Sequence, residues 1–305
     1  MLKGAGASAD ACLFEIIPKD IIKGEAIMDQ RRRRRLIAVI IAFASVCIAV
    51  CGYLVFKTIS TRSGAEEYSR LQSSYAPGIV SGTENREEKQ TEEAAPSENE
   101  DTTSEQKRQT EESPVDFRSL MKINPEVYSW IYVPNTNVNY PVLQSYEDDN
   151  FYLDHDVYKN YSFPGAIYSQ SCNSRDWSDR VTLLYGHNML DGSMFASLHR
   201  FENESFFNEN PYFYIYTADR TLTYKIVTAF DYDDKHIMNS YDFSRDEVFR
   251  SWIDQATAPR SLNANVRSDA QIDLNAKFVV LSTCQNYGDG RYLVQGVLIN
   301  DERTE

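Results

Sequence analysis

The chain has 305 residues and a formal net charge of -14 at pH 7, because 45 Asp and Glu outnumber 31 Lys and Arg. This acidity argues against a nucleic-acid partner, since binding to phosphates requires clustered Lys and Arg side chains. The length is too great for one small domain, so segments of different character are expected.

A strongly apolar segment lies near the N-terminus. Five arginines, residues 31–35, precede residues 36–56, a run of 21 residues without a charged side chain. A helix of that length spans about 31 Å, which matches the hydrocarbon core of a bilayer. A cleaved signal peptide is the alternative, but the run is longer than a usual signal-peptide core, and no convincing small-residue cleavage site accompanies it. We therefore predict a transmembrane helix at 36–56.

The five arginines also predict the orientation of this helix. Cytoplasmic flanks of membrane helices carry an excess of Arg and Lys, so residues 1–35 are expected to form a cytoplasmic N-terminal segment. The protein would then be a single-pass protein of the cell membrane, with its folded part outside the cell.

The segment after the apolar run is polar. Between Glu84 and Pro114 there are eleven acidic and four basic residues, with Ser, Thr and Gln in the gaps. Such a composition cannot bury a core. We therefore predict a disordered acidic linker at 57–114 and a folded domain at 115–305.

Short β-branched and aromatic runs, separated by turn residues, recur through the predicted domain and indicate strands. They lie at 130–133, 138–143, 166–169, 180–185, 213–217, 222–230, 278–284 and 292–299. A short helix is expected at 115–121 and an amphipathic one at 246–255, with Phe249 and Trp252 on its apolar side. Many short strands indicate a mainly β fold, either a barrel or a sandwich.

The stretch 278–299 predicts a β-hairpin, because two apolar runs flank Gln-Asn-Tyr-Gly-Asp-Gly, a sequence that tolerates turn geometry. Symmetric pairing would place Cys284 opposite Arg291, with both side chains on one face. The guanidinium favours the thiolate and can donate hydrogen bonds to an oxyanion. A disulfide between Cys172 and Cys284 is the structural alternative in an exported domain. Cys172 lies in an apparent polar loop, however, and is interpreted as a bystander.

A thiol nucleophile needs a base, and the chain has four histidines. His187 follows the predicted strand 180–185 through Gly186, which presents its ring at the end of a strand. His155 lies between two aspartates but lacks the spacing of a calcium or zinc site, so a surface loop is expected there. His199 and His236 have no comparable setting and receive no role. No metal or cofactor is predicted.

These residues together resemble a known family. Leu-Ser-Thr-Cys at 281–284, an Arg on the next strand and Tyr-Gly-His-Asn-Met at 185–189 are similar to the signature of sortases, and the match covers roughly residues 116–299. Similarity to class B in particular rests on Asn124-Pro125, Trp130-Ile131, Tyr140-Pro141-Val142, Asp149-Asn150, Ser193-Met194-Phe195 and the helical insertion before Leu281.

The resemblance implies a closed eight-stranded β-barrel with N-terminal helices and a helix in the loop before the cysteine strand. It also implies that His187, Cys284 and Arg291 are catalytic. By matching positions, the residues expected to line a peptide groove are Asn150, Tyr185, Ser282 and Thr283.

The residue types predict acyl transfer through a thioester. Cys284 would attack a peptide carbonyl, His187 would move protons, and Arg291, with the backbone amide of Gln285, would stabilise the oxyanion. The residues alone do not distinguish water from an amine as the acceptor. The resemblance implies transpeptidation: cleavage after Thr in a sorting motif such as Asn-Pro-x-Thr-Asn, and transfer of an exported protein to an amine of peptidoglycan.

Three alternatives stay open at this point: a pilin-polymerising sortase, a secreted cysteine peptidase that only hydrolyses, and an inactive membrane-tethered binding module. Arg291 follows Cys284 by seven positions. That loop is tighter than expected for class B, so the preferred motif is open as well.

Overall fold

The computed structural model describes residues 19–81, 113–270 and 272–304. It divides into two compact units, residues 1–58 and 59–305. Helix α1 (Lys19–Tyr75) begins in the first unit. Its part Gln30–Phe56 is the one stretch of the described residues that is long and apolar enough to cross a membrane, and its side chains are exposed. This is consistent with a single-pass anchor. Residues 1–18 of the expected cytoplasmic segment lie outside the described residues.

The expectation of a disordered linker from residue 57 is wrong for residues 57–81. Helix α1 runs on to Tyr75, and α2 (Pro77–Ser81) follows it. Tyr68 and Leu71 are buried in the core of the second unit, and the Tyr68 hydroxyl donates to the carbonyl of Gly165 at 2.9 Å. Apolar residues spaced by three or four positions form one helix face here, a weak signal among polar neighbours. The remainder of the predicted linker, 82–112, lies outside the described residues.

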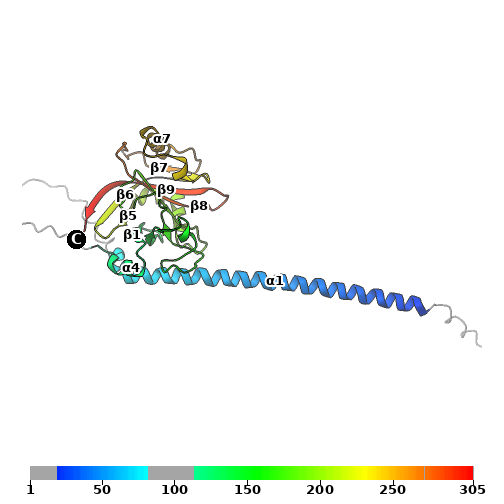
Figure 1. Cartoon of the computed structure of the whole chain (residues 1–305). Coiled ribbons are helices and arrows are strands. Elements are labelled where there is room, and N and C mark those ends of the chain that lie inside the picture. Colours follow the sequence, from blue (N-terminus) through cyan, green and yellow to red (C-terminus); the bar gives the residue numbers. More distant parts are fainter. Residues whose placement is uncertain (1–18, 82–112, 271, 305) are drawn as a thin grey trace, which may run out of the picture. The chain divides into compact units, whose positions relative to one another are not determined.

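The second unit contains the predicted β-barrel (Figure 1). Its strands are β1 (Val127–Tyr132), β2 (Asn139–Leu143), β3 (Ile167–Tyr168), β4 (Val181–Tyr185), β5 (Tyr212–Tyr216), β6 (Arg220–Tyr232), β7 (Asn265–Val266), β8 (Phe278–Cys284) and β9 (Arg291–Arg303). They pair in the order β5-β1-β2-β3-β4-β8-β9-β6-β7, and β5 also pairs with β6. That pairing closes eight strands into a barrel, with β7 attached to β6. The predicted fold is confirmed, and the two-residue strand β7 is the one that the sequence patterns missed.

Short helices precede or connect these strands: α4 (Phe117–Ile123), η2 (Phe151–Leu153), η3 (Ala196–Glu202), α5 (Glu204–Glu209), α6 (Ile237–Ser240) and α7 (Asp246–Thr257). Helix α4 begins where the side chain of Asp116 accepts a hydrogen bond from the amide of Ser119, a standard N-cap. Helices α6 and α7 lie in the insertion between β6 and β8. The helix expected before the cysteine strand is therefore present.

Strand β8 separates two packed layers because its side chains alternate between faces. Val279 and Leu281 belong to the cluster inside the barrel. Val280 packs outside it, in a second cluster with Phe249 and Trp252 of α7, and Figure 1 shows α7 above the strands on that side. Burying such a side chain contributes about 1.5–3 kcal/mol. On the outer face of β8, Phe278 and Val280 are therefore covered together with α7 residues, while Cys284 at the end of the strand is exposed.

Candidate functional site

The register predicted for the hairpin is observed. Cys284 is the last residue of β8 and Arg291 the first of β9, and their Cα atoms are direct partners across the two strands. The Nη1 atom of Arg291 donates to the Cys284 sulfur at 3.0 Å, and both residues are exposed. The backbone amide of Gln285, expected to assist at an oxyanion, instead donates to the carbonyl of Gly290 at 3.1 Å within the connecting loop.

The residues expected to line the groove do not all share the face of the thiol. Strand β4 runs parallel to β8 and pairs Tyr185 with Ser282, two residues before Cys284, so these three side chains point to the same side. Thr283 points to the other side of the sheet, where it lies next to its cross-strand partner, Tyr292 of β9. Thr283 is buried, and its hydroxyl has no hydrogen-bond partner within the described part of the chain. Its side chain is therefore turned away from the groove by strand alternation.

His187 lies two residues beyond Tyr185, so β4 and β8 present the imidazole and the thiol at neighbouring strand ends. The backbone amide of Gly186 donates to the carbonyl of Ser282 at 3.2 Å, which ties these ends together. The His187 ring stacks on Phe163, with ring centres 6.0 Å apart. Its Nε2 lies 2.8 Å from the carbonyl oxygen of Leu153. A carbonyl only accepts, so Nε2 carries the proton in this contact.

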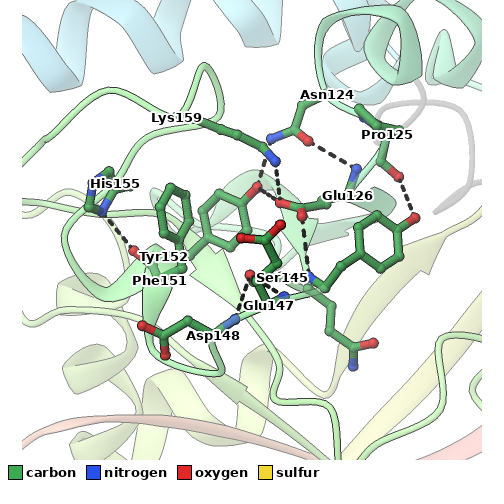
Figure 2. Close-up of polar contacts among 12 residues, drawn as sticks. Asn124, Pro125, Glu126, Ser145, Glu147, Asp148, Phe151, Tyr152, His155 and Lys159 are labelled. Atoms are coloured by element: carbon green, nitrogen blue, oxygen red, sulfur yellow. Dashed lines mark hydrogen bonds and ion pairs between the residues drawn. The ribbon is translucent and has the colours of Figure 1, made fainter.

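The Leu153 carbonyl belongs to a loop that is anchored by a buried carboxylate, Glu126 (Figure 2). Glu126 is 3% exposed, and it accepts from the hydroxyl of Tyr152 and from the amide of Tyr146. Lys159, further along the loop, lies 3.0 Å from the same carboxylate. Burial raises the pKa of Glu126, but the bonds from Tyr152 and Lys159 outweigh burial and hold that pKa below its ordinary value. No pattern in the sequence indicates this role for Glu126.

Gly165 closes the same loop. Its φ of +58° is a conformation that suits glycine, and a Cβ there would lie 2.4 Å from the carbonyl oxygen of Leu153. Only a residue without a side chain therefore leaves that carbonyl where it meets His187.

Asn150 and Tyr185, two of the expected groove residues, are joined by a residue that sequence reasoning missed. The side chain of Gln170 accepts from the Tyr185 hydroxyl at 3.2 Å and donates to Asn150 Oδ1 at 3.3 Å. Gln170 Oε1 also lies 2.8 Å from Nε2 of His236, which caps helix α6 through its other ring nitrogen. Asn150, Tyr185 and His236, from three separate segments, thus all contact the side chain of Gln170, next to the face of the sheet that carries Cys284.

The aromatic rings beside this network are close to Arg291. Tyr168 stacks on Tyr185 with ring centres 5.3 Å apart. Burial raises the pKa of Tyr168 to about 12, and the positive charge of Arg291 opposes that rise. Burial likewise raises the pKa of Tyr185. Both phenols therefore stay protonated near neutral pH and act as hydrogen-bonding walls rather than as bases.

The alternative disulfide between Cys172 and Cys284 is not formed. Both thiols are free and exposed, as are Cys47 and Cys51 of α1. Partial burial, and then the charge of Asp149, raise the pKa of Cys172. A thiol that holds its proton is a poor nucleophile, which agrees with the interpretation of Cys172 as a bystander.

His155, which lies in the same loop as Leu153, contacts its neighbours in the chain through hydrogen bonds and a ring stack. His155 Nδ1 lies 2.7 Å from the carboxylate of Asp154 and 2.9 Å from the carbonyl oxygen of Phe151, and its ring stacks on the Phe151 ring. These contacts fit the surface loop that was expected there.

Comparison with known proteins agrees with this architecture. Residues 131–299 match the family model of the Sortase domain. Sortase B of Listeria monocytogenes is 28% identical over 193 residues, which are 60% of this chain and 74% of that protein.

Two solved structures are similar as well. The crystal structure of Clostridium perfringens sortase B is 31% identical, with a TM-score of 0.55, over 60% of this chain and 99% of that chain. A Staphylococcus aureus sortase B–substrate complex is 26% identical, with a TM-score of 0.54, over 60% of this chain and 84% of that chain. The family model covers more than half of the chain and these relatives are all sortase B proteins, so the protein belongs to the sortase family, in class B.

Proposed function

We propose that this class B sortase is a membrane-anchored cysteine transpeptidase that attaches exported proteins to the cell wall. The observation that carries the proposal is the contact of 3.0 Å between Arg291 and the Cys284 thiol at the open end of a paired hairpin. A guanidinium at that distance stabilises a thiolate and meets an oxyanion that forms on an attacked carbonyl.

In the first half-reaction, the Cys284 thiolate attacks the carbonyl carbon of the Thr in a bound sorting motif. A bond forms between sulfur and carbonyl carbon, and the peptide bond after Thr then breaks to leave a thioester. The leaving amine takes a proton from His187. We assign that transfer to Nδ1, because Nε2 is bound to the Leu153 carbonyl.

In the second half-reaction, His187 removes a proton from an incoming amine, which attacks the thioester, forms the amide and releases the Cys284 thiolate. We propose an amino group of peptidoglycan as that acceptor. Asn150, Tyr185 and Ser282 are proposed to line the peptide groove, together with Gln170. Thr283 can reach it with backbone atoms only, since its side chain is turned inward.

We also propose that the helix at Gln30–Phe56 anchors the enzyme, with residues before it in the cytoplasm and the barrel facing the cell wall. Protease added to wall-stripped intact cells should release a soluble fragment that contains Cys284. Cleavage restricted to residues before Arg31 would reverse this orientation.

The reaction is tested with the full chain in detergent and a library of motif peptides of the Asn-Pro-x-Thr-Asn type. Mass spectrometry should find an acyl-enzyme without acceptor, and an amide product once a peptidoglycan stem-peptide amine is added. Hydrolysis that persists at a saturating amine concentration would indicate a peptidase, and transfer only to lysines of an exported protein would indicate pilin polymerisation. The absence of any acyl-enzyme across the library would indicate a binding module.

A further inference from the structure

His199, which lies in η3, makes direct contact with the backbone of the proposed nucleophile. Its Nε2 is 3.0 Å from the carbonyl oxygen of Cys284, and its Nδ1 is 2.5 Å from Oε1 of Glu202. The side chain is 10% exposed, and its ring stacks on buried Tyr292 with ring centres 4.7 Å apart. His199 is thus stacked on one ring and held at both ring nitrogens, which is unusual for a histidine in a short surface helix.

The two ring nitrogens of His199 face different acceptors. The Cys284 carbonyl only accepts, so Nε2 is the donor in that contact. Nδ1 faces the Glu202 carboxylate on the other edge of the ring. His199 therefore links Glu202 to the Cys284 backbone.

Two asparagines complete a closed set of hydrogen bonds around this pair. Asn188 Nδ2 donates to the Cys284 carbonyl at 3.1 Å and to Asn286 Oδ1 at 3.0 Å. Asn286 Nδ2 in turn points to Glu202 Oε1 at 3.5 Å. The two amide protons of Asn188 are thus used by these two acceptors. Asn188 Nδ2 also lies 3.1 Å from His199 Nε2, so both nitrogens approach the same carbonyl, that of Cys284.

This set connects the three parts that the reaction must align. Asn188 directly follows His187, Cys284 ends β8, and Asn286 lies in the loop that leads to Arg291. Cys284 is the last residue of β8. The contacts of its carbonyl with His199 and Asn188 come from outside the hairpin and hold the end of this strand.

We propose that His199, held by Glu202, is a positioning residue that fixes the nucleophile relative to the base. The proposal rests on the proposed function in one respect, that Cys284 is the nucleophile. Misplacement of a reacting group by about 1 Å can cost about a hundredfold in rate. Loss of the His199 donor should therefore slow acylation without weakening peptide binding.

Three substitutions of His199 test its contact with Cys284 and its contact with Glu202 separately. In the full chain, His199→Gln can place an amide near Nε2 and keep the bond to Cys284, whereas His199→Asn can keep only the bond to Glu202. His199→Phe keeps the stack on Tyr292 and loses both bonds. The readouts are kcat and KM for acylation, the melting temperature, and hydrogen exchange of the amides of residues 284–291.

We expect His199→Gln to stay within about threefold of the wild-type kcat, and His199→Asn and His199→Phe to fall by about tenfold to a hundredfold with KM unchanged. Exchange of the hairpin amides should rise in the last two variants and stay low in His199→Gln. A His199→Phe enzyme within twofold of wild type would overturn the proposal. A parallel fall of all three variants in rate and melting temperature would also overturn it, because it would make His199 merely structural.

Failure of the proposed function can be told apart from failure of this inference. If the wild type forms no acyl-enzyme, the proposed function fails, and hydrogen exchange still decides on positioning. Faster exchange at residues 284–291 in His199→Phe than in His199→Gln would support the positioning role, and equal exchange in both variants would overturn it.

Discussion

The two sides of the proposed catalytic centre are held in different ways. Cys284 and Arg291 face each other because adjacent strands pair in register across one short loop. His187 instead depends on the carbonyl of Leu153, in a loop that is anchored by buried Glu126. The nucleophile side is thus fixed by local pairing, while the base side is fixed by contacts between distant segments. Changes far from the chemistry should therefore damage the base side first.

The largest effect is expected for the nucleophile itself. Cys284→Ala removes the sulfur that forms the thioester, so turnover and the acyl-enzyme should both fall below detection. Cys172→Ala is the matched control, because Cys172 is also a free, exposed thiol of the barrel domain. It should keep nearly wild-type activity in the same peptide assay. Loss of activity in the Cys172 variant alone would transfer the nucleophile role to Cys172.

The base side should show the next largest effect. His187→Ala removes the proposed acid and base of both half-reactions, so kcat should fall by about a hundredfold to ten-thousandfold. The rate of Cys284 alkylation by iodoacetamide should change far less, since Arg291 stays in contact with the thiol. An active His187→Ala enzyme would remove His187 from the mechanism.

Arg291→Lys tests the nucleophile side without loss of charge. Lysine cannot present the planar donors of a guanidinium, so acylation should slow by about a hundredfold if those donors must meet an oxyanion at fixed positions. Single-turnover measurements isolate this step from the transfer to an amine. A rate close to wild type would reduce Arg291 to a general electrostatic role.

The smallest effect is expected for Glu126→Gln, which weakens the anchor of the Leu153 loop (Figure 2). Loss of charge-assisted bonds should lower the free energy of unfolding by about 2 kcal/mol. It should reduce kcat by about tenfold through His187 while Cys284 alkylation stays unchanged. Glu147→Gln, at an exposed carboxylate of the same loop, is the control and should alter neither quantity. Equal loss of alkylation and turnover in Glu126→Gln would break the distinction between the two sides.

The stability provided by Glu126 should depend on pH. Burial opposes ionisation of Glu126, but bonds from Tyr152 and Lys159 prevail, so its folded-state pKa lies below the ordinary 4.5. A depressed carboxyl pKa contributes stability above the unfolded-state pKa, and the contribution is lost as pH falls through the folded-state pKa. In denaturant titrations, the difference between wild type and Glu126→Gln should be full near neutral pH and shrink below about 4.5. A difference that grows in acid would contradict this sign.

The sequence predicted best what depends on neighbours in the chain. The eight barrel strands, the helix α7 and the register of Cys284 with Arg291 follow from periodicity and turn residues, and the structure contains all of them. It predicted His187 at a strand end but not its bond to Leu153, because a carbonyl contact across the fold leaves no pattern in a single sequence.

The misses have the same origin. Gln170, His199 and Glu126 matter through partners that lie far away in the chain, and no local spacing marks them. The family resemblance implies a groove position for Thr283, although strand alternation turns its side chain to the face opposite that of Cys284. For residues 57–81 the sequence predicts a linker, because the few apolar residues on one helix face are outnumbered by polar ones.

The most direct test of the account is to locate the acyl group on the enzyme. The full chain is incubated with a motif peptide that it turns over, without an amine acceptor, quenched in acid, and digested for peptide mapping. We predict that the added mass lies on Cys284, in the fragment that contains β8 and the hairpin loop. An acyl group on Cys172, or on a side chain other than a cysteine, would contradict the claim that the thiol beside Arg291 carries the reaction.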